Sequence, residues 1–164
     1  TQIILHHSSV ENARYYFAEL QPFSVDFDVI GLSYYPQFQT KNLTVVQHSL
    51  DYLAETFGKK IMVVETAYPF TLGYDDNLTN FIGDNSQLIP EFPATPSGQK
   101  AFLKKMTQII RNIPDGKGFG WIYWAPDWVA FPGNENTSTG GSSWENQTLW
   151  DFDHNPLPAI DAFN

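Results

Sequence analysis

Apolar residues gather in four short runs, separated by stretches in which they recur at helical spacing. The runs cover residues 2–5, 27–33, 60–65 and 119–124. None alternates cleanly between apolar and polar residues, which is typical of strands buried on both faces of a parallel sheet. The runs are also far too short to cross a bilayer, so we expect no membrane span.

The stretches between the runs predict three helices, at residues 12–20, 43–57 and 97–113. Gly58 is placed to end the second helix, and residues 114–116 (Pro-Asp-Gly) to end the third. Strands that alternate with helices in this way predict the α/β class with a parallel sheet. Four βα units are half of a (β/α)8 TIM barrel, and nothing in the sequence provides the second helical layer of an open sheet.

Two long polar loops follow the third and fourth predicted strands, at residues 66–96 and 125–147. Loops of this length inside a compact domain are usually functional. In a (β/α) barrel they would lie at the carboxyl ends of the strands, where active sites are built.

Charge and composition exclude several classes of protein. The net charge of −9 argues against a nucleic-acid partner, because such proteins concentrate Lys and Arg on one face. The absence of cysteine rules out disulfide frameworks and thiolate metal sites. The first residues read as a strand rather than as a signal peptide, so an exported protein would carry its signal upstream of residue 1.

Aromatic residues are in excess, with 13 Phe, 8 Tyr and 5 Trp. Part of this excess must form the core. Tyr and Trp at strand ends and in polar loops, however, suit the binding of sugar rings through their apolar faces.

Glu65 directly follows the apolar run Ile-Met-Val-Val, at the end of a predicted buried strand. A carboxylate is costly there unless it is paired or used, so a salt-bridged structural Glu and a functional Glu both remain open. The other strands end in His6-His7, in Ser33-Tyr34-Tyr35-Pro36 and in Tyr123-Trp124. All four strands therefore bring polar or aromatic residues to the same rim of the sheet.

Five segments together resemble glycoside hydrolase family 53, the endo-β-1,4-galactanases that act on arabinogalactan and pectic galactan. The similarity runs through essentially all 164 residues, in order. It implies a retaining glycosidase on a TIM barrel, with residues 1–164 forming the C-terminal half of the catalytic domain. The segments are residues 27–36 (FDVIGLSYYP), 63–69 (VVETAYP), 92–99 (FPATPSGQ), 143–147 (SWENQ) and 149–158 (LWDFDHNPLP).

The resemblance implies that Glu65 is the nucleophile of the retaining mechanism. Tyr34 or Tyr35 would orient Glu65 and keep it ionised; only one can, because neighbouring strand residues point to opposite faces. The acid/base Glu of the family would lie in the half of the barrel that this chain lacks. The remaining carboxylates are expected on helices or in loops, so we expect the isolated chain to be inactive.

Further residues would bind the substrate, again by resemblance. His6 would face the cleft, and Trp124 would form the platform under a galactose ring. Trp128 and Trp144 are candidates for flanking subsites. Together with Tyr34 and Tyr35, these residues make up the expected substrate-binding set.

Two features depart from the family. Its last strand usually continues as Tyr-Trp-Glu-Pro-Ala-Trp, whereas residues 123–128 read Tyr-Trp-Ala-Pro-Asp-Trp, so an acidic residue has moved by two positions. Some relatives bind calcium between the last two loops, but here the first of them offers only residues 74–77 (Tyr-Asp-Asp-Asn). We expect no cofactor, with calcium as the alternative.

Three interpretations remain open. The chain is a piece of a complete secreted, cell-surface or periplasmic galactanase that pairs with the missing half of the barrel. Alternatively, it is a non-catalytic half-barrel that binds galactan through Trp124, Trp128 and Trp144. Exposed edges of the sheet also favour self-association.

Overall fold

The computed structural model describes residues 1–131 and 141–163, which fall into two compact units. The first unit comprises Thr1–Thr66 and Lys105–Tyr123, and the second comprises the described residues of 67–104 and 124–164. Residues 132–140 of the predicted loop 125–147 lie outside the described part. Membership of residues 1–164 in a single catalytic domain stays a prediction.

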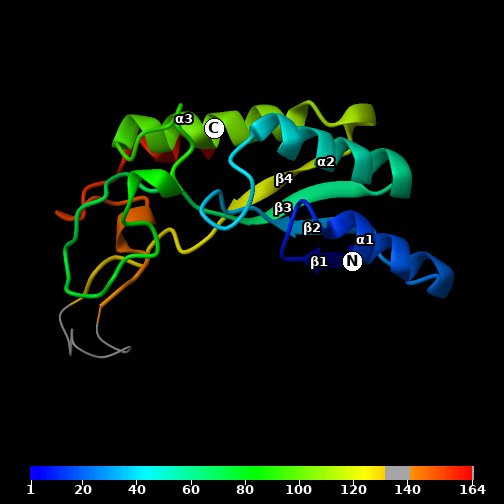
Figure 1. The fold of residues 1–164 in the computed structure, drawn as a ribbon, viewed down its shortest axis with the longest axis horizontal. Coiled ribbons are helices and arrows are strands. Elements are labelled where there is room, and N and C mark those ends of the chain that lie inside the picture. Colours follow the sequence, from blue (N-terminus) through cyan, green and yellow to red (C-terminus); the bar gives the residue numbers. More distant parts are fainter. Residues whose placement is uncertain (132–140, 164) are drawn as a thin grey trace. The chain divides into compact units, whose positions relative to one another are not determined.

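A parallel sheet forms the centre of the first unit (Figure 1). In the described residues its strands are β1 (Ile4–His7), β2 (Val29–Ser33), β3 (Lys60–Thr66) and β4 (Gly118–Tyr123), hydrogen-bonded in the order β1-β2-β3-β4. All three neighbouring pairs are parallel, which confirms the predicted α/β arrangement.

The first strand begins two residues later than predicted, because pairing with β2 starts at Ile4 opposite Val29. Ile3 still accepts backbone hydrogen bonds from Asp28 and Val29, but its side chain is exposed. The strand ends at His7, in agreement with the prediction that it ends in His6-His7.

The helices are α1 (Ala13–Leu20), α2 (Leu43–Phe57) and α3 (Pro96–Arg111). The Asn42 side chain caps α2 by accepting from the backbone N–H groups of Thr44 and Val45. Gly58 ends the same helix with φ +66°, as predicted. Short 3₁₀ turns cover Gln21–Phe23, Asn85–Gln87, Pro114–Gly116, Glu145–Gln147 and Pro158–Phe163.

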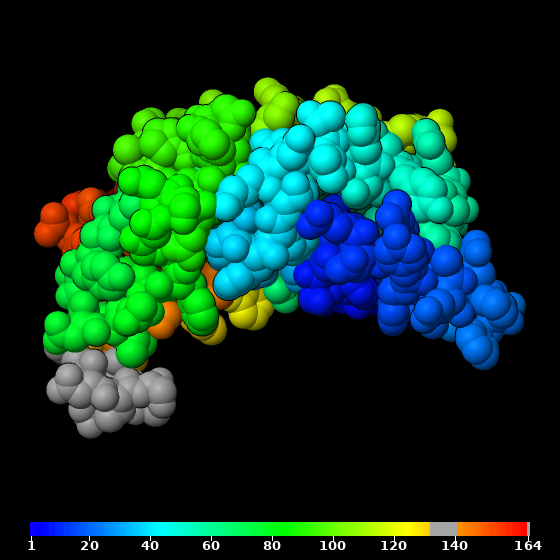
Figure 2. Space-filling model, in the orientation of Figure 1, coloured from blue at the N-terminus to red at the C-terminus, as the bar shows by residue number. Residues whose placement is uncertain are grey.

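The core of the first unit lies on one face of the sheet. Ile30 pairs with Ile61 and Leu32 with Val63, and all four side chains are fully buried. Phe17 of α1 adds a ring that contacts Phe27 and Phe57. Away from this core, α1 and the turn after it form part of the visible surface in Figure 2 (blue).

The opposite face carries Gly31, where the absence of a side chain leaves room for side chains of the two neighbouring strands. A Cβ atom at this position would lie 2.7 Å from Cγ2 of Ile4 and 3.1 Å from Cγ1 of Val64. Ile4 is 41% exposed and Ile122, in β4, is 48% exposed. Two aliphatic residues on the edge strands are thus open to solvent.

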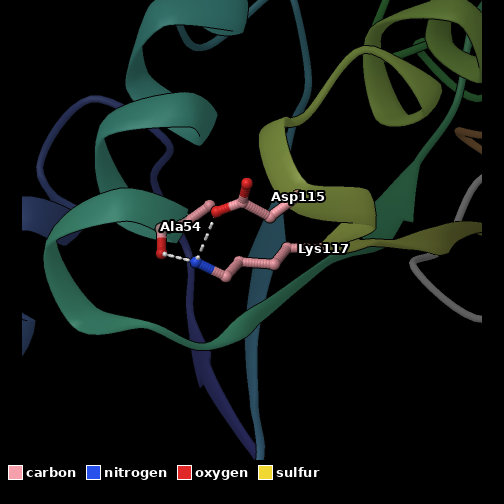
Figure 3. A network of polar contacts seen from close by, with 3 residues as sticks. All are labelled: Ala54, Asp115 and Lys117. Atoms are coloured by element: carbon pink, nitrogen blue, oxygen red, sulfur yellow. Dashed lines mark hydrogen bonds and ion pairs between the residues drawn. The ribbon is translucent and has the colours of Figure 1, made fainter.

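Lys117 joins the end of α2 to the turn before β4 (Figure 3). Its Nζ donates to the carbonyl oxygen of Ala54 at 3.2 Å and to Oδ2 of Asp115 at 3.3 Å. Asp115 is exposed and has φ +57°. An exposed ion pair of this kind stabilises by at most about 1 kcal/mol.

Buried amides hold the second unit together. Gln99 Nε2 donates to the carbonyl oxygens of Tyr68 and Thr148, at 2.9 Å each. Asn146 Nδ2 donates to Thr71 O at 3.0 Å and Ile82 O at 2.6 Å. These bonds connect the loop after β3 with the segment after β4. No helix within the described residues has the length and apolar character needed to cross a membrane.

Candidate active site

Glu65 lies near the carboxyl end of β3, where the strand contains a bulge. Leu32 pairs with Val63, but the next residue of β2, Ser33, pairs with Glu65, so Val64 is an extra residue in β3. A bulge re-aims the side chains that follow it. Here it places the half-buried Glu65 carboxylate beside the last residues of β2.

Two hydroxyl groups donate to the same carboxylate oxygen. Ser33 Oγ lies 2.9 Å from Glu65 Oε2, and Tyr35 Oη lies 3.2 Å from it. Ser33 and Tyr35 are two residues apart, so they point to the same side of the extended chain. Within the described residues, no protein group is hydrogen-bonded to Oε1 of Glu65.

The two adjacent tyrosines have different partners. Tyr34 is fully buried, and its hydroxyl donates to the carbonyl oxygen of Thr40 at 2.9 Å. Tyr35 is the one that contacts Glu65. The structure therefore assigns the contact with Glu65 to Tyr35, which the sequence left open.

Burial, followed by the negative charge of Glu65, raises the pKa of Tyr35 far above its ordinary value. The phenol therefore stays protonated throughout the physiological pH range. Tyr35 is consequently a permanent hydrogen-bond donor to the carboxylate.

His6 extends the same set of contacts onto a third strand. It pairs with Gly31 and shares that face of the sheet with Ser33. Its Nε2 lies 2.8 Å from Ser33 Oγ. His6, Ser33, Tyr35 and Glu65 thus form one group of polar side chains, contributed by β1, by the end of β2 and by β3.

The three predicted tryptophans lie in the second unit. The rings of Trp124 and Trp128 have centroids 5.9 Å apart, and the ring of Trp144 lies 5.1 Å from that of Phe81. A cavity of about 620 Å³ is lined by Phe81, Trp128, Trp144 and neighbouring residues. Its volume is in the range of small-ligand sites, and its aromatic lining is of the kind that stacks against sugar rings.

Glu145 is a second carboxylate that the sequence did not single out. It is 1% exposed, and its Oε1 accepts from Asp75 N at 3.0 Å and from Asn80 Nδ2 at 3.2 Å. Its Oε2 accepts from Asp76 N at 3.1 Å. Burial raises the pKa of Glu145 above its ordinary value. The side chain fastens the loop after β3 to the segment after β4.

Asp76, in the loop at residues 74–77, has hydrogen-bond partners on both carboxylate oxygens. Asp76 Oδ1 accepts from Leu78 N at 2.7 Å and Oδ2 from Ser142 N at 2.6 Å, so peptide N–H groups point at the oxygens that a cation would need. No group of three or more His, Asp or Glu in the described part of the chain could hold a metal. That the protein needs no cofactor stays a prediction.

Three other carboxylates of the first unit have hydrogen-bond partners away from Glu65. Glu11 accepts from Thr40 N, Asp28 from Ile3 N and Asp51 from Gln47 Nε2. Among the described residues of this unit, Glu65 has no second carboxylate as a hydrogen-bond partner.

A parallel βα sheet with a carboxylate at the end of a strand is the arrangement found in TIM-barrel hydrolases. The model of glycosyl hydrolase family 53 matches residues 1–163, and the chain belongs to this family. The fold is accordingly that of a (β/α)8 barrel, of which the chain forms half.

Known proteins agree with this assignment. The arabinogalactan endo-β-1,4-galactanase of Cellvibrio japonicus is 41% identical over 163 residues, covering 97% of this chain and 42% of the relative. The endo-β-1,4-galactanase of Bacillus subtilis is 32% identical and is covered to 44%. The family 53 catalytic domain of Ignisphaera aggregans superposes with a TM-score of 0.90 at 30% identity, over 99% of this chain and 46% of that domain. The chain thus spans less than half the length of these relatives.

Proposed function

We propose that this chain is the nucleophile-bearing half of a retaining endo-β-1,4-galactanase. Family membership and the names of its relatives support a glycosidase that acts on galactan or arabinogalactan. The observation that carries the proposal is the Glu65 carboxylate, held on Oε2 by two hydroxyl donors.

In the proposed mechanism, Oε1 of Glu65 attacks the anomeric carbon of a galactosyl residue. The bond to the leaving oxygen breaks as the ester forms, and a general acid protonates that oxygen. Hydroxyl donors on Oε2 fix the plane of the carboxylate, so that Oε1 can point at the substrate.

The general acid is the part that we place outside this chain. Retaining glycosidases need a second carboxyl group about 5–5.5 Å from the nucleophile. The hydrogen-bond partners of Glu11, Asp28 and Asp51 support roles in structure. We therefore propose that the isolated chain is inactive and gains activity when the other βα units complete the barrel. Secretion of the whole protein is part of the same proposal.

The test is the release of reducing ends from β-1,4-galactan. The chain is assayed alone and after co-production with the part of the Cellvibrio japonicus galactanase that it does not cover. We expect no activity from the chain alone and measurable activity from the pair. Glu65→Gln in the pair should abolish that activity.

Glu55→Gln is the matched control. It makes the same chemical change as Glu65→Gln, but at an exposed position on α2. This variant should retain full activity in the pair. Activity of the chain alone that disappears with Glu65→Gln would refute the missing-acid part of the proposal. Activity of the pair that survives Glu65→Gln would refute the role of Glu65.

A galactan-binding module without catalysis is the second candidate. It is favoured by the aromatic cavity of the second unit, with Phe81, Trp128 and Trp144 in its lining. Such a module should bind galactan equally well with Glu65→Gln and lose binding with Trp144→Ala. Isothermal titration of the chain with galacto-oligosaccharides separates the two candidates.

A further inference from the structure

One hydroxyl group connects two ionisable side chains in the first unit. Ser33 Oγ lies 2.8 Å from His6 Nε2 and 2.9 Å from Glu65 Oε2. Ser33 is 3% exposed, so solvent does not replace these partners. The three residues come from β1, β2 and β3, and their pairing keeps them in register.

The number of protons fixes the direction of both hydrogen bonds. A serine hydroxyl has one proton to donate, and an ionised carboxylate can only accept. With Glu65 ionised, Ser33 gives its proton to Oε2 and must accept from His6. His6 therefore has to carry a hydrogen on Nε2, whether the ring is neutral or charged.

We propose that Ser33 is a positioning residue, which holds the Glu65 carboxylate through its single proton and thereby fixes the Nε2–H form of His6. The catalytic use of this arrangement rests on the proposed function. Both donors, Ser33 and Tyr35, engage Oε2, so Oε1 is the oxygen left for bond formation. In the resulting ester, Oε2 is the carbonyl oxygen, and it regains negative charge when water cleaves the ester.

The arrangement can be tested in the 164-residue chain without any turnover. Chain labelled with ¹⁵N-histidine is examined by long-range ¹H–¹⁵N correlation, which shows which ring nitrogen of neutral His6 carries the hydrogen. We expect a pyrrole-type Nε2 in the wild type. In Glu65→Met the carboxylate is gone, so Ser33 should donate to Nε2, and the hydrogen of His6 should move to Nδ1.

The double variant Ser33→Ala/Glu65→Met supplies the decisive comparison, because without the hydroxyl the hydrogen should stay on Nε2. His7, whose Nδ1 contacts Ser9, serves as the internal reference and should not change. Glu65→Leu replaces Glu65→Met if the latter loses the wild-type pattern of backbone amide signals. Ser49→Ala, on α2, is the matched serine control.

Two results would overturn the inference: neutral wild-type His6 with its hydrogen on Nδ1, or a response to the loss of Glu65 that is the same with and without Ser33. Neither result depends on galactan cleavage. A failure of the proposed function would instead show as an inactive completed barrel, with the His6 spectra unchanged.

Discussion

Glu65, in the first unit, is half-buried and accepts hydrogen bonds from two hydroxyl groups on one carboxylate oxygen. Glu145, in the second unit, is fully buried and accepts hydrogen bonds from N–H groups on both carboxylate oxygens. Two of the donors to Glu145 are peptide N–H groups, whose positions are fixed by the backbone. Both hydroxyl donors at Glu65 lie on Oε2, and in the described part of the chain Oε1 accepts no hydrogen bond. The kind and placement of donors, rather than burial, therefore distinguish a carboxylate that holds a structure from one that can react.

The strongest test of this comparison is turnover of galactan by the completed barrel. Glu65→Gln should lower the rate by about 10⁴-fold or more, because removal of a nucleophile eliminates the covalent step. Glu145→Gln should change the rate far less, once rates are corrected for the folded fraction measured by circular dichroism. Equal losses of rate for the two folded variants would contradict the different roles assigned to Glu65 and Glu145.

Loss of the Glu145 side chain should lower the free energy of unfolding more than loss of the Glu65 side chain, which is the reverse of their order in catalysis. Glu145→Ala leaves three N–H donors without their acceptor in a buried site, which should lower the free energy of unfolding by about 3 kcal/mol. Glu65→Ala should cost about 1 kcal/mol or less, because the Ser33 hydroxyl can rotate and donate to Nε2 of His6, which lies 2.8 Å away.

Urea unfolding of the chain measures both values, with Glu55→Ala as the control for the loss of an exposed carboxylate. That control should change the free energy of unfolding by about 0.5 kcal/mol or less. A larger loss for Glu65→Ala than for Glu145→Ala would contradict the structural role assigned to Glu145.

The difference between the two glutamates also explains how far the sequence could predict the site. Glu65 follows a buried apolar run, so its place at a strand end could be predicted from local pattern alone. Glu145 lies in a polar loop, and its partners Asp75, Asp76 and Asn80 are at least 65 residues away in the chain. No local pattern contains such contacts.

The parallel sheet and the three helices were predictable for the same reason, since each depends on the spacing of apolar residues. The bulge at Val64 was not, because it is defined by register against β2 and β4. A prediction that does not include this bulge cannot place Ser33 beside Glu65. It also cannot decide whether Tyr34 or Tyr35 contacts Glu65.

Tyr34 and Tyr35 allow the effect of a single hydroxyl group on Glu65 to be tested. Tyr35→Phe removes one of two donors to Glu65 and should lower kcat of the completed barrel by about tenfold, with KM little changed. Tyr34→Phe is the matched control: it removes a part-buried hydrogen bond to Thr40 O and should cost about 1 kcal/mol of stability with kcat unchanged. A kcat that falls only with Tyr34→Phe would reverse the assignment.

The smallest effect concerns the pH dependence of stability. Burial raises the pKa of Glu145 above its ordinary value, and the nearby Asp76 carboxylate acts in the same direction. Between the ordinary and the raised value, the folded chain holds a proton that the unfolded chain has released, so the free energy of unfolding should fall as pH rises through this window. Glu145→Gln cannot titrate and should flatten that part of the curve, whereas Glu55→Gln should leave it unchanged. Urea unfolding across the acidic range measures the slope, and a slope that persists in Glu145→Gln would mean that another group carries the proton.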